Sequence, residues 1–290
     1  MEEQKKTVTG PVIRVVNCCY SYDSKNNSLE DINLSMPEND FAAIIGQNGC
    51  GKSTLLKNIC GLLRPSSGEI FINGKNSKNF SVSAISREIG FVMQNPDSQL
   101  FTDTVYKEVS FALRNIYKND LSLNEAEIRL RTEQALAAVG LAGQKNAFPL
   151  ALSRGDRKKT VIAAVLAMGC KTIILDEPDA NQDNYGCRLI MDTVRGLNKQ
   201  GYTIIFVTHN MSLAAEYAHR LIVMGANKIR MDGTPAEIFY RVDELAQLRI
   251  VPPQIVGLCL GLQKELKQQF KLDVLDAAQL GEALLRSKKS

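Results

Sequence analysis

The stretch that decides the fold is Phe41-Ala-Ala-Ile-Ile-Gly46-Gln-Asn-Gly-Cys-Gly51-Lys52-Ser53. Its first five residues are apolar throughout, which is typical of a β-strand buried on both faces. Gly46 to Ser53 match the pattern GxxxxGK[ST], and residues 53–63 have the composition of a helix. A glycine-rich loop between a strand and a helix predicts a phosphate-binding loop, because its backbone N–H groups can surround phosphate oxygens at the helix N-terminus.

Each residue of this loop has an expected role at a nucleoside triphosphate. We expect the Lys52 ammonium to reach the β- and γ-phosphates and the Ser53 hydroxyl to bind Mg²⁺. Cys50 is expected to supply chiefly its backbone. The predicted phosphate-binding residues are Gly46, Gln47, Asn48, Gly49, Cys50, Gly51, Lys52, Ser53 and Thr54. A chance glycine-rich turn is the alternative, which the flanking strand and helix disfavour.

A second apolar run, Lys171-Thr-Ile-Ile-Leu-Asp176-Glu177-Pro178, ends in two acids. Ligands bind at the carboxyl ends of parallel strands, so Asp176 is expected to hold Mg²⁺, directly or through water. Glu177 is expected to polarise an attacking water, as a general base or a water-positioning group. Taken alone, the run is equally consistent with a structural role, in which Asp176 caps the next turn and Glu177 is solvated. The phosphate-binding loop upstream favours the catalytic interpretation.

Apolar runs and helical stretches alternate along most of the chain. Runs at 13–16, 172–175 and 203–207 look like strands, and 124–139, 157–168 and 184–199 look like helices. This alternation predicts a parallel sheet flanked by helices. Residues 221–231 resemble a hairpin, and Thr234 is expected to cap the helix that follows.

The pattern changes after about residue 241. Apolar residues from Ile255 to Phe270 fall on one helical face, and Asp276 is expected to cap a further helix. We interpret 241–290 as a small helical module. Its apolar face needs a partner surface, which is either the rest of this chain or another chain.

Composition narrows the class of protein. The chain has 290 residues, 44 % of them hydrophobic and 23 % charged, as in globular proteins of one or two domains. A net charge of +4 argues against a nucleic-acid partner. Seven cysteines without a CxxC pair, and two histidines, argue against a disulfide scaffold or zinc site and suit a reducing cytosol. No apolar run approaches the roughly 18 residues that span a bilayer, so any membrane role is expected to come through a partner.

With these motifs in order, the chain resembles the ATP-binding subunits of ABC transporters. The resemblance implies that Tyr22, or else Tyr20, stacks on adenine. It implies that Gln94 meets Mg²⁺ or the attacking water and that His209 contacts the γ-phosphate. Leu152-Ser153-Arg154-Gly155-Asp156 occupies the place of the LSGGQ signature, and Asp183 matches the D-loop aspartate. The resemblance thus places three further residues at a nucleotide: Ser153, Gly155 and Asp183. The predicted catalytic residues are Glu177, His209 and Gln94. The predicted metal ligands are Ser53, Gln94 and Asp176.

The resemblance also implies the architecture. We expect an α/β fold of the P-loop NTPase, ABC ATPase type, with a mostly parallel core sheet, an antiparallel β subdomain and a helical signature subdomain. The cassette is predicted over 12–240, with the helical subdomain at about 95–168. The helical C-terminal module is predicted over 241–290, with a possible role in dimerisation.

A finer resemblance is to the ATPases of energy-coupling factor importers of vitamins and metal ions. It rests on Asn95-Pro-Asp-Ser-Gln-Leu-Phe101 and on Arg249-Ile-Val-Pro-Pro-Gln. It implies ATP and Mg²⁺ as cofactors, and a peripheral place on the cytoplasmic face of the cell membrane. The implied partners are a second ATPase subunit, a transmembrane coupling subunit and a substrate-binding membrane subunit. Alternatives are the ATPase of another importer class, a soluble ABC ATPase of DNA repair or translation, or a regulatory subunit with little catalysis.

The signature departs from the family pattern. Arg154 adds bulk where glycine lets the backbone approach a phosphate, and Asp156 adds negative charge there. We expect Arg154, Arg157, Lys158 and Lys159 to offset that charge. A homodimer would carry the altered signature at both nucleotide sites, so a heterodimer with a different ATPase is preferred.

Overall fold

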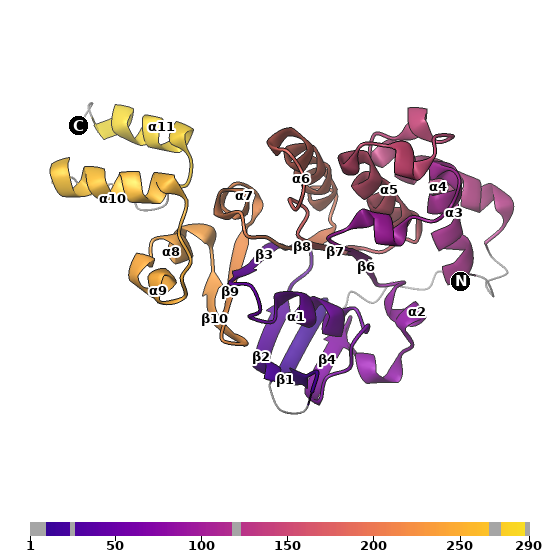
Figure 1. Ribbon diagram of the computed structural model, residues 1–290, viewed down its shortest axis with the longest axis horizontal. Coiled ribbons are helices and arrows are strands. Elements are labelled where there is room, and N and C mark those ends of the chain that lie inside the picture. The colour runs from indigo at the N-terminus through magenta and orange to yellow at the C-terminus, as the bar shows by residue number, and fades with distance from the viewer. Residues whose placement is uncertain (1–9, 24–26, 118–122, 267–273, 288–290) are drawn as a thin grey trace.

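The computed structural model describes residues 10–23, 27–117, 123–266 and 274–287. Within these ranges the chain forms two sheets and a set of helices that cover them (Figure 1). The strands are β1 Ile13–Ser21, β2 Asn27–Met36, β3 Phe41–Gly46, β4 Ser67–Ile72, β5 Lys75–Asn76, β6 Ile89–Val92, β7 Thr172–Asp176, β8 Thr203–Val207, β9 Arg220–Gly225 and β10 Lys228–Gly233. The α-helices are α1 Lys52–Ile59, α2 Val82–Ile85, α3 Val105–Ile116, α4 Glu125–Ala138, α5 Arg154–Ala167, α6 Asn184–Asn198, α7 Met211–Tyr217, α8 Pro235–Phe239, α9 Val242–Gln247, α10 Gln254–Leu266 and α11 Ala277–Ser287.

The larger sheet has the strand order β10-β9-β3-β8-β7-β6, and every pair in it is parallel except β10 with β9. The smaller sheet, β2-β1-β4-β5, is antiparallel. Helices α3, α4 and α5 pack against one another at the β6 end of the larger sheet (Figure 1). The fold is thus the expected P-loop NTPase fold of ABC ATPase type.

Strand β3 lies between β9 and β8 and contributes side chains to two separate apolar cores. Phe41, Ala43 and Ile45 point into the core that the sheet shares with α5 and α6. Ala42 and Ile44 point into the core that the sheet shares with α1 and the antiparallel strands. All five residues are fully buried. This explains the uninterrupted apolar run in the sequence, because a strand covered on both faces has no polar side.

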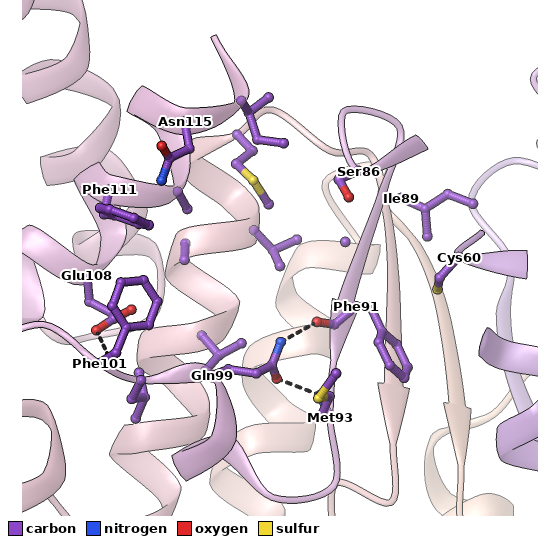
Figure 2. A pocket seen from close by; sticks show the side chains of 18 of the residues that line it. Cys60, Ser86, Ile89, Phe91, Met93, Gln99, Phe101, Glu108, Phe111 and Asn115 are labelled. Atoms are coloured by element: carbon purple, nitrogen blue, oxygen red, sulfur yellow. Dashed lines mark hydrogen bonds between the residues drawn. The ribbon is translucent and has the colours of Figure 1, made fainter. Parts of the chain in front are cut away.

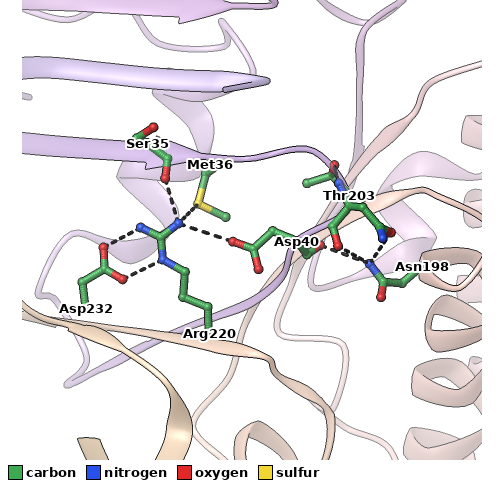
Figure 3. Close-up of polar contacts among 8 residues, drawn as sticks. Ser35, Met36, Asp40, Asn198, Thr203, Arg220 and Asp232 are labelled. Carbon is green, nitrogen blue, oxygen red and sulfur yellow. Dashed lines mark hydrogen bonds and ion pairs between the residues drawn. The ribbon is translucent and has the colours of Figure 1, made fainter. Parts of the chain in front are cut away.

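An arginine joins the two sheets at one edge. Arg220, the first residue of β9, binds both carboxylate oxygens of Asp232 on β10 at 2.6 Å (Figure 3). Its Nη1 also donates to the carbonyl oxygen of Ser35 on β2 at 2.8 Å and lies 3.3 Å from Asp40, which precedes β3. The bidentate pair, which is the stronger kind of ion pair, holds the guanidinium against β10. The bond from Nη1 to Ser35 then ties β2 to the larger sheet.

The C-terminal helices begin on the cassette and end away from it (Figure 1). Leu245, Ile250 and Val256 are buried in the same core as the larger sheet. Cys259, Val274 and Leu280 form a small core of their own between α10 and α11. The predicted caps are confirmed: Asp276 accepts from the Gln279 N–H at 2.8 Å, and Thr234 forms a capping box with Glu237. None of the helices in the described ranges is long and apolar enough to cross a membrane.

Candidate active site

The phosphate-binding loop connects β3 to α1 through glycines in the left-handed region. Gly51, which precedes α1, has φ 98°, and a Cβ on it would lie 2.3 Å from the carbonyl oxygen of Ser28. Only glycine fits there. None of the described side chains caps the N-terminus of α1. Its first N–H groups and the positive end of the helix dipole therefore form a site suited to an anion such as a phosphate.

The side chain of Lys52 folds back over this loop. It is buried, and its Nζ donates to the carbonyl oxygens of Gly46 at 2.9 Å and Gln47 at 2.8 Å. Burial lowers the pKa of Lys52, and the carboxylates of Glu177 and Asp176 act against that shift. An ammonium with only neutral acceptors and little water is well suited to bind phosphate oxygens.

Ser53 and Asp176 meet at the end of β7. The Ser53 hydroxyl donates to Asp176 Oδ1 at 3.1 Å. Burial raises the pKa of Asp176, and the hydrogen bond from Ser53 opposes that rise. A hydroxyl and a carboxylate are hard oxygen ligands, and Mg²⁺ usually takes one or two such protein ligands together with substrate phosphates and water. These two residues therefore fit the predicted metal.

Two distant segments of the chain converge on the carboxylate of Glu177. Gln94 Nε2 donates to Glu177 Oε2 at 2.6 Å, and His209 Nε2 lies 3.2 Å from Glu177 Oε1. The Glu177 side chain is 22 % exposed, so it is not freely solvated. The structure thus brings the three predicted catalytic residues together beside the phosphate-binding loop, with the Gln94 amide bound to Glu177.

A cavity of about 280 Å³ is lined by Lys52, Ser53, Glu177 and His209, whereas Gln94 and Asp176 are not among its lining residues. The Tyr22 ring stands at its edge, 60 % exposed and edge-to-face with Tyr20 at 4.9 Å between centroids. The Tyr22 hydroxyl lies 3.3 Å from Thr54 Oγ1. An exposed ring anchored to the loop leaves an aromatic face open for a base, as predicted for adenine. The lining residues are Tyr22, Ser28, Asn48, Gly49, Gly51, Lys52, Ser53, Thr54, Glu177 and His209.

The predicted signature and D-loop residues lie outside this cavity. Ser153 caps α5: its Oγ accepts from the Asp156 N–H at 3.2 Å and donates to Asp156 Oδ2 at 2.9 Å. Gly155 is buried in the first turn of the same helix. Asp183 caps α6 by accepting from the Gly186 N–H at 2.6 Å. Within this chain, therefore, Ser153, Gly155 and Asp183 do not face the phosphate-binding loop.

The expected neutralisation of Asp156 is correct for Lys159 and wrong for Arg157 and Lys158. Lys159 Nζ lies 3.3 Å from Asp156 Oδ1. Arg157 instead binds Asp97 at 3.0 Å, because its side chain reaches the turn Pro96–Gln99. Lys158 is fully buried, and its Nζ donates to the carbonyl oxygen of Glu177 at 3.0 Å.

Sequence reasoning missed Lys158 as a site residue, although a signal exists. Lys158 stands one turn before Ile162, on the apolar stripe that α5 buries. A lysine in such a stripe is unusual, because lysines are almost never fully buried without a partner.

A second cavity, of about 370 Å³, lies between β6, α3 and α5 (Figure 2). Its lining is mostly apolar, and Phe101 and Phe111 form an exposed edge-to-face pair at 4.7 Å between centroids. Gln99 is fixed against β6, since its side chain donates to Phe91 O at 3.0 Å and accepts from the Met93 N–H at 2.8 Å. The cavity therefore opens directly beside the segment that carries Gln94.

Comparison with known proteins gives a consistent result. The family profile described as "ABC transporter" matches residues 29–180. Proteins named energy-coupling factor transporter ATP-binding proteins are 36 % identical, among them one from Caldanaerobacter subterraneus (94 % of this chain, 96 % of the relative) and one from Methanocaldococcus jannaschii (88 % and 90 %). Three other relatives, named ABC transporter ATP-binding proteins and 37–39 % identical, are longer, and this chain spans only 41–45 % of their length.

Solved structures agree with this result. CbiO1 from Clostridium perfringens, described as part of the ABC transporter complex CbiONQ, superposes with a TM-score of 0.74 at 34 % identity, over 86 % of this chain and 99 % of that one. A dimeric ATP-binding cassette bound to ADP and Pi superposes with a TM-score of 0.66 at 26 % identity, over 77 % and 98 %. From its cassette fold, its phosphate-binding loop and these relatives, the chain belongs to the ABC transporter family of ATPases, and it is similar to the ATP-binding subunits of energy-coupling factor transporters.

Proposed function

We propose that this chain hydrolyses ATP to ADP and phosphate and thereby powers import of a vitamin or metal ion through an energy-coupling factor type ABC transporter. The observation that carries the proposal is the carboxylate of Glu177. It lies next to Asp176 at the end of β7, beside a phosphate-binding loop, and both its oxygens are held by predicted catalytic residues. A carboxylate in this position can accept a proton from water that attacks a phosphate bound in the loop.

In the proposed reaction the loop binds and orients ATP. Lys52 and the N–H groups at the start of α1 hold the β- and γ-phosphates, and the Tyr22 ring stacks on adenine. Glu177 accepts a hydrogen bond from the attacking water, and His209 contacts the γ-phosphate. Gln94 exchanges its bond to Glu177 for the water or metal. Ser53 and Asp176 would hold Mg²⁺, which would supply positive charge to offset that of the phosphate oxygens.

We further propose that the apolar cavity beside Gln94 docks the transmembrane coupling subunit. An exposed aromatic pair at the mouth of an apolar cavity is typical of protein interaction sites. Docking there would place a membrane partner in contact with the segment that carries Gln94, and the chain would lie peripherally on the cytoplasmic face of the membrane. A separate membrane subunit would select the substrate.

The signature supports pairing with a different ATPase. The Ser153 hydroxyl donates its hydrogen bond to Asp156, so a γ-phosphate held by a partner chain would have to compete with Asp156 for this donor. A heterodimer would carry this feature at one nucleotide site only, which is why we propose a heterodimer over a homodimer.

The test of the proposed reaction is Glu177→Gln. We expect the variant to bind ATP normally and to lose hydrolysis by about 10²–10⁴-fold, because removal of a catalytic base has effects of this size. Phosphate release by the full-length chain, together with the membrane subunits that co-purify with it, measures this. Glu216→Gln, on α7, removes a surface carboxylate that pairs with Arg188 and should leave the rate unchanged. Near-normal turnover by Glu177→Gln would contradict the assignment.

A further inference from the structure

Lys158 carries a fully buried charged group that the proposed reaction does not use. Lys158 lies in the second turn of α5, five residues after Ser153, and its side chain is 0 % exposed. Its Nζ donates to the carbonyl oxygen of Glu177 at 3.0 Å and to that of Pro178 at 2.9 Å. Both acceptors belong to the two peptide groups that directly follow the proposed catalytic base.

The environment of this ammonium is costly for a cation. Burial lowers the pKa of Lys158 to about 8, and the negative charges of Asp179, Glu177 and Asp176 only partly oppose the shift. Across the residues that the structure describes, no carboxylate lies within ion-pair distance of Lys158 Nζ. Neutral carbonyl oxygens are its hydrogen-bond acceptors, so its bonding is directed at the backbone of one short segment.

That segment has a backbone conformation that needs support. Glu177 has φ 46°, in the left-handed region that residues other than glycine adopt only at a cost. Its N–H donates to Val207 O at 3.1 Å, and its carbonyl oxygen also accepts from the Ala180 N–H at 3.1 Å. The direction of the Glu177 side chain follows from this conformation, because φ and ψ set where Cβ points. Rotation about the N–Cα bond of Glu177 moves its carbonyl group and its Cβ together, so a change in this φ would carry the carboxylate away from Gln94 and His209.

We propose that Lys158 is a positioning residue for Glu177: its two hydrogen bonds hold the strained backbone after Glu177 so that the carboxylate faces the phosphate-binding loop. The inference rests on the proposed function. Lys158 also links the signature to the proposed catalytic base, because α5 carries the signature at its N-terminus and Lys158 one turn later. If a nucleotide bound by a partner chain moved Ser153, the first turn of α5 would move with it, and Lys158 would pass this movement to the backbone of Glu177.

The test replaces the ammonium with an apolar chain of similar length, Lys158→Met. We expect kcat for ATP hydrolysis to fall by at least about tenfold while the KM for ATP stays within about twofold, because a misplaced catalytic group slows the reaction without weakening binding. Lys158→Gln, which keeps a neutral donor on a shorter side chain and needs no buried charge, should give an intermediate kcat. Lys171→Met removes an exposed lysine at the opposite end of β7 and should leave both constants unchanged.

A double-variant cycle separates positioning from a general role in packing. If Lys158 acts through Glu177, Lys158→Met should reduce the residual rate of Glu177→Gln by less than about twofold. A full further loss in that background would overturn the inference, as would wild-type kcat in both the Met and Gln variants. A wild-type chain that hydrolyses no ATP, or an active Glu177→Gln, would instead refute the proposed function.

Discussion

At the residue scale, Lys52 gives a direct test of the phosphate-binding loop. We expect Lys52→Ala to weaken ATP binding by about 10–100-fold, since it removes a charge-assisted hydrogen bond worth about 1.5–3 kcal/mol. The transporter that contains this variant should be inactive. Calorimetric titration of the full-length chain with ATP measures the affinity. Lys199→Ala, at the exposed end of α6, is the control, and an unchanged affinity of the Lys52 variant would contradict the role.

Single residues differ in how far the sequence predicts them. The loop residues and Asp176 were predictable because their chemistry depends on local order: a strand, a fixed spacing and a helix. The catalytic roles of Gln94 and His209 came only from a resemblance, and their contacts with Glu177 were not predicted, since residues 83 and 32 positions apart in the chain carry no local sign of contact. The role predicted for Lys158, to offset the charge of Asp156, was wrong because a run of basic residues looks solvated. On α5, however, successive residues of this run point in different directions.

At the element scale, α5 carries the altered signature that, in the proposed heterodimer, would make the two nucleotide sites unequal. The Ser153–Asp156 contact satisfies the helix N-terminus from within the chain. We expect Arg154→Gly with Asp156→Gln to speed hydrolysis at the nucleotide site that this signature serves by about tenfold, through one recovered hydrogen bond to phosphate. Single-turnover measurements on the assembled transporter, site by site, test this. The prediction fails if neither site changes, or if this chain alone assembles a transporter with two equal sites.

The same scale shows which elements a sequence reveals. Strands β3, β7 and β8 were predicted because burial on both faces makes them continuously apolar. No strand was predicted at β2, whose residues are partly buried and partly exposed and include asparagine, serine and aspartate. Its place depends on pairing with β1 and on Arg220, 184 residues beyond Met36, and such distant contacts leave no local pattern.

At the scale of the whole molecule, the C-terminal helices present an unpaired apolar surface. Leu258 on α10 is 52 % exposed and Leu285 on α11 is 67 % exposed, although α10 begins in the main core. We expect Leu258→Gln to weaken pairing of the ATPase subunits without nucleotide by about tenfold, as for loss of one buried leucine at an interface. Sedimentation gives the dissociation constant, with Lys264→Gln on the same helix as the control. An unaltered constant would confine the role of this module to its own cassette.

The position of β3 has a consequence for how the protein melts. Because alternate residues of this one strand fill both cores, loss of order in one core would disturb the other, and we expect the two cores to unfold together. The phosphate-binding loop is the direct continuation of β3. A ligand held there at 100 times its Kd adds about 2.7 kcal/mol to the free energy of unfolding, and both cores share this gain. Bound nucleotide would therefore protect the antiparallel sheet from heat as strongly as it protects the larger sheet.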